Sequence, residues 1–146
     1  MPARTARTAW NGTLQEGSGQ VELSSSKVGT FEVSFPKRTA DEAGGTTSPE
    51  ELIAAAHSSC FAMALSSEIG KAGGQPVSLE ITADVTLGQK DGGPHITKIA
   101  LTVRGEVEGL DADGFEKAAQ AAKAGCPVSK ALAGVDEITL DAALEN

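Results

Sequence analysis

The feature that most constrains this chain is the stretch SPEELIAAAHSSCFAMALSSEIG, which runs from Ser48 to Gly70. Ser48 followed by Pro49, with Glu51 three residues after the serine, is the pattern of a helix start, and Gly70 favours a helix end. The helix predicted over 48–70 is apolar on most of its circumference, whereas a helix packed on one sheet carries a single apolar stripe. It therefore needs cover on two sides, from a second helix and a partner subunit.

The rest of the chain divides into short segments of strand or helix pattern. We expect three strands over 5–13, 19–25 and 30–35, followed by a hairpin of strands over 79–87 and 99–103. A second helix over 110–125, a short helix over 126–132 and a last strand over 136–144 follow. Strands grouped apart from helices are typical of an α+β fold with a mainly antiparallel sheet. The sequence thus predicts one domain over residues 1–146, with two principal helices, and a homodimer whose helices lie between sheets.

Charge and cysteine content narrow the function. A net charge of −8 disfavours nucleic acid and anionic membranes as partners. The N-terminal segment has no apolar run typical of a signal peptide. We also expect no membrane span, because no segment reaches roughly 18 uncharged apolar residues, and the nearest, 52–65, is interrupted by His57 and serines. We therefore expect a soluble, cytoplasmic protein, and in that reducing setting two cysteines are more often reactive or metal-binding than a permanent disulfide.

Cys60, deep inside the predicted helix, can be reactive only if a cation keeps it ionised. A free thiol titrates near about 8.5, and burial raises that value. One positive charge about 4 Å away, at an effective dielectric of about 20, contributes roughly 4 kcal/mol, or about three pKa units. Lys37 and Arg38, predicted at the end of the third strand, are the candidates, and arginine suits the role because it stays charged and has a planar fork of donors.

Local rules alone favour the other thiol. Cys126 lies before Pro127 at a predicted helix start, where backbone amides stabilise a thiolate. Both cysteines could equally be small core residues, and His57 and His95 could be structural. A zinc site needs about four ligands, of which His57 and Cys60 supply at most two. The residues alone give two candidate thiols without ranking them.

Two motifs together carry a family resemblance: SPEELIAAAHSSCFAMALS and AKAGCPVS. With the AWNG strand and the EITLDAAL ending, the chain resembles the osmotically inducible protein C (OsmC) and organic hydroperoxide resistance (Ohr) family over nearly its whole length. The histidine three residues before the first cysteine is similar to the OsmC branch. The resemblance implies an intertwined homodimer with two active sites at the subunit interface.

The resemblance also implies a thiol-dependent peroxidase that reduces organic hydroperoxides, and hydrogen peroxide, without a bound cofactor or metal. By position, Cys60 is then the peroxidatic cysteine, Cys126 the resolving cysteine, and Glu50 the acidic partner of a catalytic arginine, which best matches Arg38. Lys37 would face the opposite way on an extended strand. A cellular dithiol would reduce the resulting disulfide.

The apolar neighbours Phe61, Met63 and Leu65 favour hydrophobic hydroperoxides. Two alternatives from other classes stay open: a non-catalytic redox sensor, and a structural domain whose cysteines are inert or form a permanent disulfide. A disulfide closing a loop of this length would contribute roughly 4 kcal/mol in the entropy model, so the structural alternative is physically reasonable.

Overall fold

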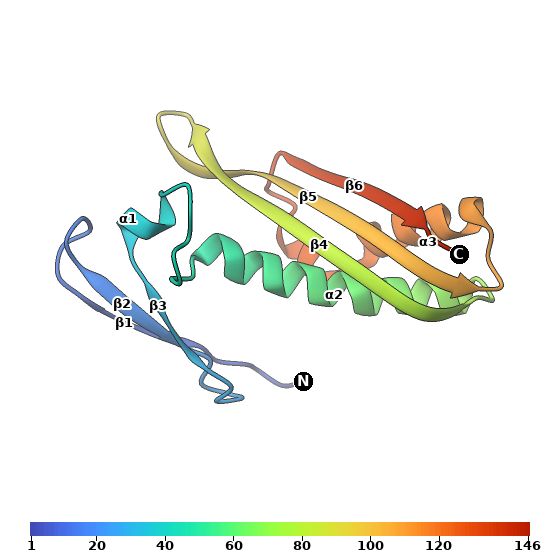
Figure 1. The fold of residues 1–146 in the computed structure, drawn as a ribbon, viewed down its shortest axis with the longest axis horizontal. Helices are drawn as coiled ribbons and strands as arrows, with labels where there is room; N and C mark the ends of the chain where they lie inside the picture. Colours follow the sequence, from blue (N-terminus) through green and yellow to red (C-terminus); the bar gives the residue numbers. More distant parts are fainter. The chain divides into compact units, whose positions relative to one another are not determined.

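The computed structural model describes residues 1–146 and has the α+β composition that the sequence predicts. Its residues group into two compact units, Met1–Leu52 and Ile53–Asn146, and each contains its own three-stranded sheet (Figure 1). Helix α2 (Pro49–Lys71) begins in the first unit and continues into the second. The single domain expected over 1–146 stays a prediction.

The first unit is an antiparallel sheet followed by a helical turn. Its strands are β1 (Arg7–Asn11), β2 (Ser18–Glu22) and β3 (Thr30–Val33), in the spatial order β1-β2-β3. The chain then forms helix α1 (Phe35–Arg38), and the Ser34 side chain accepts the N–H of Lys37 at its start. Arg38 therefore lies in a helical turn, and its expected place at the end of the third strand was wrong.

Helix α2 starts as predicted, because the Ser48 hydroxyl accepts the N–H of Glu51 at 3.1 Å. Four of its side chains, spaced four residues apart, are fully buried: His57, Phe61, Leu65 and Ile69. This spacing places them on one face of the helix. Met63, in contrast, is 73% exposed, so apolar surface remains open on α2.

Helix α2 is also long and apolar enough to cross a membrane, with a mean hydropathy of 1.3 over an 18-residue window. The expectation that no segment reaches this composition rested on the interruptions at His57 and the serines. Length and composition do not distinguish a membrane span from a core helix. One face of α2 packs in the hydrophobic core of the second unit, and 22% of that window is buried.

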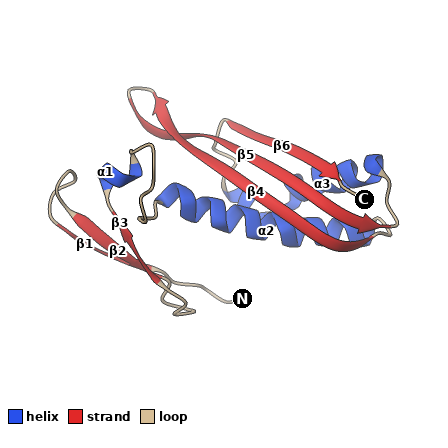
Figure 2. Ribbon diagram, viewed as in Figure 1, coloured by secondary structure: helices blue, strands red, loops and turns tan.

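The second sheet contains the expected hairpin and one parallel pair (Figure 2). Strands β4 (Gln75–Lys90) and β5 (Gly93–Glu108) are antiparallel and are joined at Asp91 and Gly92. Both residues have positive φ, 52° and 78°, as an Asp-Gly hairpin turn requires. Strand β6 (Glu137–Leu144), however, runs parallel to β5, because α3 and α4 carry the chain back across the sheet between them.

Helices α3 (Ala112–Gly125) and α4 (Pro127–Ala131) form this crossover, and Cys126 is the single residue between them. The Asp111 carboxylate accepts the N–H of Gly114 at 2.8 Å and caps α3, as predicted. One core joins α2, α3 and β5; its fully buried members include Phe61, Leu65, Ile99, Leu101, Val103, Phe115, Ala119 and Cys126. The second cysteine is thus fixed in the same core as the helix that carries the first.

Candidate functional site

The two cysteines, 66 residues apart in sequence, meet inside the second unit. The sulfur atoms of Cys60, on α2, and Cys126, after α3, lie 3.3 Å apart, and both thiols are free. A disulfide has an S–S length of about 2.05 Å, so only a small approach separates this pair from a covalent bond. The two sulfur atoms are therefore in contact but are not bonded.

Backbone geometry fixes the position of Cys126. Its N–H donates to the carbonyl of Ala122 at 2.7 Å, which ends α3, and its own carbonyl accepts the N–H of Lys130 at 3.0 Å, which begins α4. Pro127 is pre-organised for the first helical position. The GCPVS sequence thus holds the thiol at a junction of two helices rather than on a mobile loop.

The two thiols differ in acidity. Burial raises the pKa of the Cys60 thiol; the hydrogen bond and charge of Cys126 raise it further, and only the Val128 N–H opposes this. Burial also acts to raise the pKa of Cys126, but hydrogen bonds from Ser129, Cys60 and Val128 outweigh it and lower the pKa overall. Within the second unit, Cys126 is the more acidic thiol.

The two cysteines also differ in exposure to solvent, and here the less acidic one, Cys60, is the more exposed. Cys126 is fully buried, whereas Cys60 is partly exposed. Of the two cysteines, only Cys60 has surface exposed to solvent. Access and acidity therefore point to different cysteines.

In the first unit, Arg38 and Glu50 form a two-pronged ion pair. Arg38 Nε donates to both carboxylate oxygens of Glu50, at 2.9 and 3.1 Å, and one terminal nitrogen donates to Oε1 at 2.7 Å. The Glu50 residue is only 7% exposed, and the Arg38 side chain is 31% exposed. Lys37, next to it, is exposed and has no ion pair. The first turn of α2 thus holds the guanidinium in a defined orientation.

The structure therefore brings the four predicted site residues together as two pairs, Cys60 with Cys126 and Arg38 with Glu50. Each pair lies within its own unit. That a guanidinium reaches the Cys60 sulfur stays a prediction. No group of three or more His, Cys, Asp or Glu side chains is placed to hold a metal ion.

Sequence reasoning missed a polar contact between His57 and Ser129. Ser129 is buried on α4, and its hydroxyl lies 2.6 Å from Nε2 of His57 on α2. No local signal marks Ser129, because its partner is 72 residues away in sequence. His57 lies three residues before Cys60, and from the sequence we expected it to be structural.

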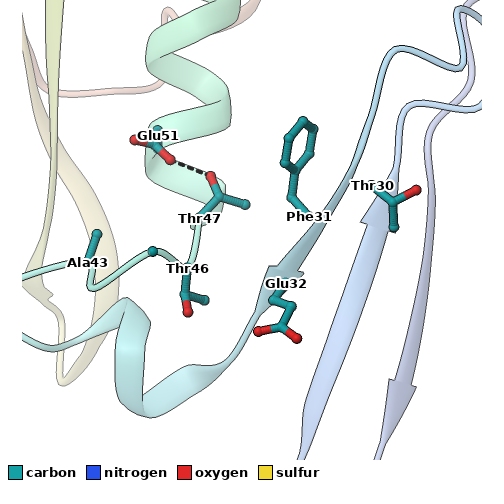
Figure 3. Close-up of a pocket in the computed structure, with 8 residues that line it drawn as sticks. Thr30, Phe31, Glu32, Ala43, Thr46, Thr47 and Glu51 are labelled. Atoms are coloured by element: carbon teal, nitrogen blue, oxygen red, sulfur yellow. Dashed lines mark hydrogen bonds between the residues drawn. The ribbon is translucent and has the colours of Figure 1, made fainter.

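Two hollows in the first unit differ in their lining. One, of about 410 Å³, lies beside Arg38 and is lined largely by apolar side chains, among them Trp10, Val21, Phe35 and Leu52. The other, of about 520 Å³, is lined by Thr46, Thr47, Glu51 and neighbours, with Thr47 donating to Glu51 (Figure 3). Neither lining contains a thiol, and of the two only the first contains a cation, Arg38.

The chain thus places two free thiols 3.3 Å apart in an α+β fold with one parallel strand pair. The chain belongs to the OsmC-like protein family, whose model matches residues 41–141. It is 47% identical to peroxiredoxin OsmC of Escherichia coli (strain K12) over 94% of this chain and 93% of that protein. It is 33% identical to organic hydroperoxide resistance protein OhrA of Bacillus subtilis (strain 168), over 83% and 85%.

Solved structures agree with the fold. An organic hydroperoxide resistance protein from Elizabethkingia anophelis matches with a TM-score of 0.77 at 27% identity, covering 99% of both chains. OhrB of Bacillus subtilis matches with a TM-score of 0.71 at 27% identity, covering 97% of this chain and 98% of that one. The α+β architecture predicted from the sequence is therefore that of the family.

Proposed function

We propose that this protein is a thiol-dependent peroxidase that reduces organic hydroperoxides, and hydrogen peroxide, in defence against oxidative and osmotic stress. The observation that carries the proposal is the 3.3 Å approach of the sulfur of Cys60, a partly exposed residue, to the sulfur of Cys126, a buried one. The names of the relatives, peroxiredoxin OsmC and organic hydroperoxide resistance protein, support the same reaction class.

Ionisation of Cys60 is the first step, and Arg38 supplies the charge. Because burial raises the pKa of Cys60, the thiol stays protonated at neutral pH unless a cation approaches. A guanidinium about 4 Å away contributes roughly 4 kcal/mol at an effective dielectric of about 20. Glu50 holds the guanidinium through its two carboxylate oxygens, and the remaining donors of Arg38 bind the peroxide.

The thiolate of Cys60 then attacks one peroxide oxygen. The O–O bond breaks, an alcohol leaves, and Cys60 becomes a sulfenic acid. Cys126 condenses with the sulfenic acid to form the disulfide and water, and an external cellular dithiol reduces that disulfide. All electrons pass through sulfur, so the proposed cycle needs no bound cofactor or metal.

The substrates proposed are hydroperoxides with an apolar group. Phe61 and Leu65, which suggested this preference from the sequence, are fully buried in the core and do not line an accessible site. The 410 Å³ hollow beside Arg38, with Trp10, Phe35 and Leu52 in its lining, gives the preference a different basis. We expect a higher kcat/KM for cumene hydroperoxide than for hydrogen peroxide, and equal values would contradict the preference.

The proposed assembly is a homodimer with active sites at the subunit interface. Three residues of α2 with small or apolar side chains, Ala55, Ala56 and Met63, are exposed in the single chain. A second copy is the proposed cover, because exposed apolar surface of this kind is buried in obligate dimers. If a site takes Arg38 from one copy and Cys60 from the other, mixed dimers of the impaired Arg38→Ala variant and the inactive Cys60→Ser variant regain activity. Sites built within one chain give no recovery.

The proposed setting is the cytoplasm, because the cycle needs two free thiols and a dithiol reductant. Nucleic acid and membranes are not proposed as partners, since the net charge of −8 opposes both.

The proposal is tested by steady-state turnover of cumene hydroperoxide with a dithiol reductant. We expect turnover by the wild-type protein, none by Cys60→Ser, and strongly reduced dithiol-dependent turnover by Cys126→Ser. Arg38→Ala should lower kcat/KM, whereas the exposed neighbour Lys37→Ala, the matched control, should not. A single oxidation without turnover would favour a redox sensor, and no oxidation would favour a structural pair. Loss with Lys37→Ala and full activity with Arg38→Ala would contradict the arginine assignment.

A further inference from the structure

A buried histidine and a buried serine, each three residues from a cysteine in sequence, contact each other, and the proposed cycle gives them no role. His57 on α2 is completely buried, and its Nε2 lies 2.6 Å from the hydroxyl of Ser129 on α4. Its other ring nitrogen, Nδ1, is buried and has no hydrogen-bond partner. Leaving a buried polar atom without a hydrogen-bond partner costs about 1–3 kcal/mol.

The burial of His57 fixes the direction of this hydrogen bond. Burial lowers the pKa of His57, so the ring is neutral at neutral pH and carries one N–H. An unpartnered buried N–H is rarer in proteins than an unpartnered acceptor, which assigns the proton to Nε2 rather than Nδ1. His57 then donates to the Ser129 oxygen, and the hydroxyl proton of Ser129 is left free to donate elsewhere.

Ser129 lies three residues after Cys126 on α4, and a hydrogen bond from its side chain acts on the Cys126 thiol. This hydrogen bond, with those from the backbone N–H groups of Ser129 and Val128, lowers the pKa of Cys126 against the opposing effect of burial. The His57–Ser129 contact and the effect of Ser129 on the Cys126 thiol thus link the three side chains. His57 and Cys60 both belong to α2, Ser129 belongs to α4, and Cys126 directly precedes α4.

We propose that His57 and Ser129 are positioning residues for the resolving thiol, with His57 orienting the Ser129 hydroxyl so that it donates to the Cys126 sulfur as that sulfur attacks Cys60. This rests on the proposed peroxidase cycle. In the step concerned, Cys60–SOH and Cys126–SH become the disulfide and one water. The S–S bond forms and the S–O bond breaks; the Cys126 sulfur is oxidised, the Cys60 sulfur is reduced, and the Cys126 thiol proton ends on the leaving hydroxide.

The test separates the two half-reactions. Cys60 sulfenic acid is generated with one equivalent of cumene hydroperoxide, and its formation and decay are followed by quenching with dimedone. The variants are Ser129→Ala, His57→Phe, which keeps a buried ring without a donor, and His57→Gln, whose amide N–H can replace Nε2–H. His95→Gln, at the exposed histidine, is the matched control. In parallel, Cys126 alkylation by iodoacetamide is measured in the Cys60→Ser chain, where no peroxide chemistry takes place.

We expect Ser129→Ala and His57→Phe to slow sulfenic acid decay and Cys126 alkylation by about tenfold, the effect of removing one hydrogen bond to a charged group. Sulfenic acid formation should stay near the wild-type rate, and His57→Gln should recover most of the loss. Unchanged decay in Ser129→Ala, or equal losses in His57→Phe and His57→Gln, would overturn the proposal. If the wild-type protein forms no sulfenic acid, the peroxidase proposal fails, and the alkylation rates still decide whether Ser129 and His57 act on Cys126.

Discussion

The ion pair between Arg38 and Glu50 gives a sharp prediction for stability. Arg38→Ala leaves the Glu50 carboxylate, which is 7% exposed, without the three hydrogen bonds that it accepts. Breaking a buried ion pair costs about 3–5 kcal/mol, and the 31% exposure of the Arg38 side chain moves the expected loss to the lower end, about 3 kcal/mol. Glu50→Ala leaves the guanidinium unpaired but partly hydrated, so its expected cost is lower, about 2 kcal/mol.

A double-mutant cycle isolates the pair. The free energy of unfolding is measured by urea titration for the wild-type protein, both single variants and the double variant, at one protein concentration. We expect a coupling energy of about 2 kcal/mol, because the double variant leaves no unpaired buried charge. Lys37→Ala, at the exposed neighbour, should change stability by less than about 0.5 kcal/mol. A coupling energy below about 0.5 kcal/mol, typical of surface pairs, would refute the reasoning.

Three further predictions concern the second unit. Phe61→Ala, at a fully buried ring in the core, should destabilise by about 3–5 kcal/mol in urea unfolding, and a loss under 1 kcal/mol would mean that the ring is not in the core. Asp111→Ala should cost about 1 kcal/mol, since it removes the acceptor for the Gly114 N–H, and an unchanged midpoint would be inconsistent with that cap. Because burial depresses the pKa of His57 in the folded state, the unfolded chain binds this proton first as pH falls. Stability should therefore decline below about pH 6.5, by at most about 1.4 kcal/mol per pH unit, and His57→Gln should remove that part of the slope.

Much of the fold could be predicted from the sequence, because its signals are local. Ser48 and Pro49 mark the start of α2, Asp111 caps α3, and alternating apolar residues give the β4–β5 hairpin. The parallel pairing of β5 with β6 could not be predicted in the same way, since strand direction depends on where the intervening helices return the chain. At α1 the alternation of Phe31, Val33 and Phe35 favoured a longer strand, although Ser34 and Pro36 carry a helix-start signal.

The candidate site was predictable in its residue types and less so in its contacts. Local rules named Cys60 and Cys126 but could not rank them, and in the structure acidity favours one thiol and access the other. The two-pronged contact of Arg38 with Glu50 follows from the fork of the guanidinium once the two residues meet. Ser129 was invisible, because its role depends on a contact that only the folded chain creates.

The central claim is that peroxide oxidises Cys60 and that Cys126 then closes a disulfide with it. Mass spectrometry after one equivalent of cumene hydroperoxide tests this most directly, on the wild-type protein, Cys60→Ser and Cys126→Ser. The account predicts an intramolecular Cys60–Cys126 disulfide in the wild-type protein. It predicts a sulfenic acid on Cys60 in the Cys126→Ser variant, and an unmodified Cys126 thiol in the Cys60→Ser variant. Oxidation of Cys126 in the Cys60→Ser protein, with Cys60 unmodified in Cys126→Ser, would contradict it.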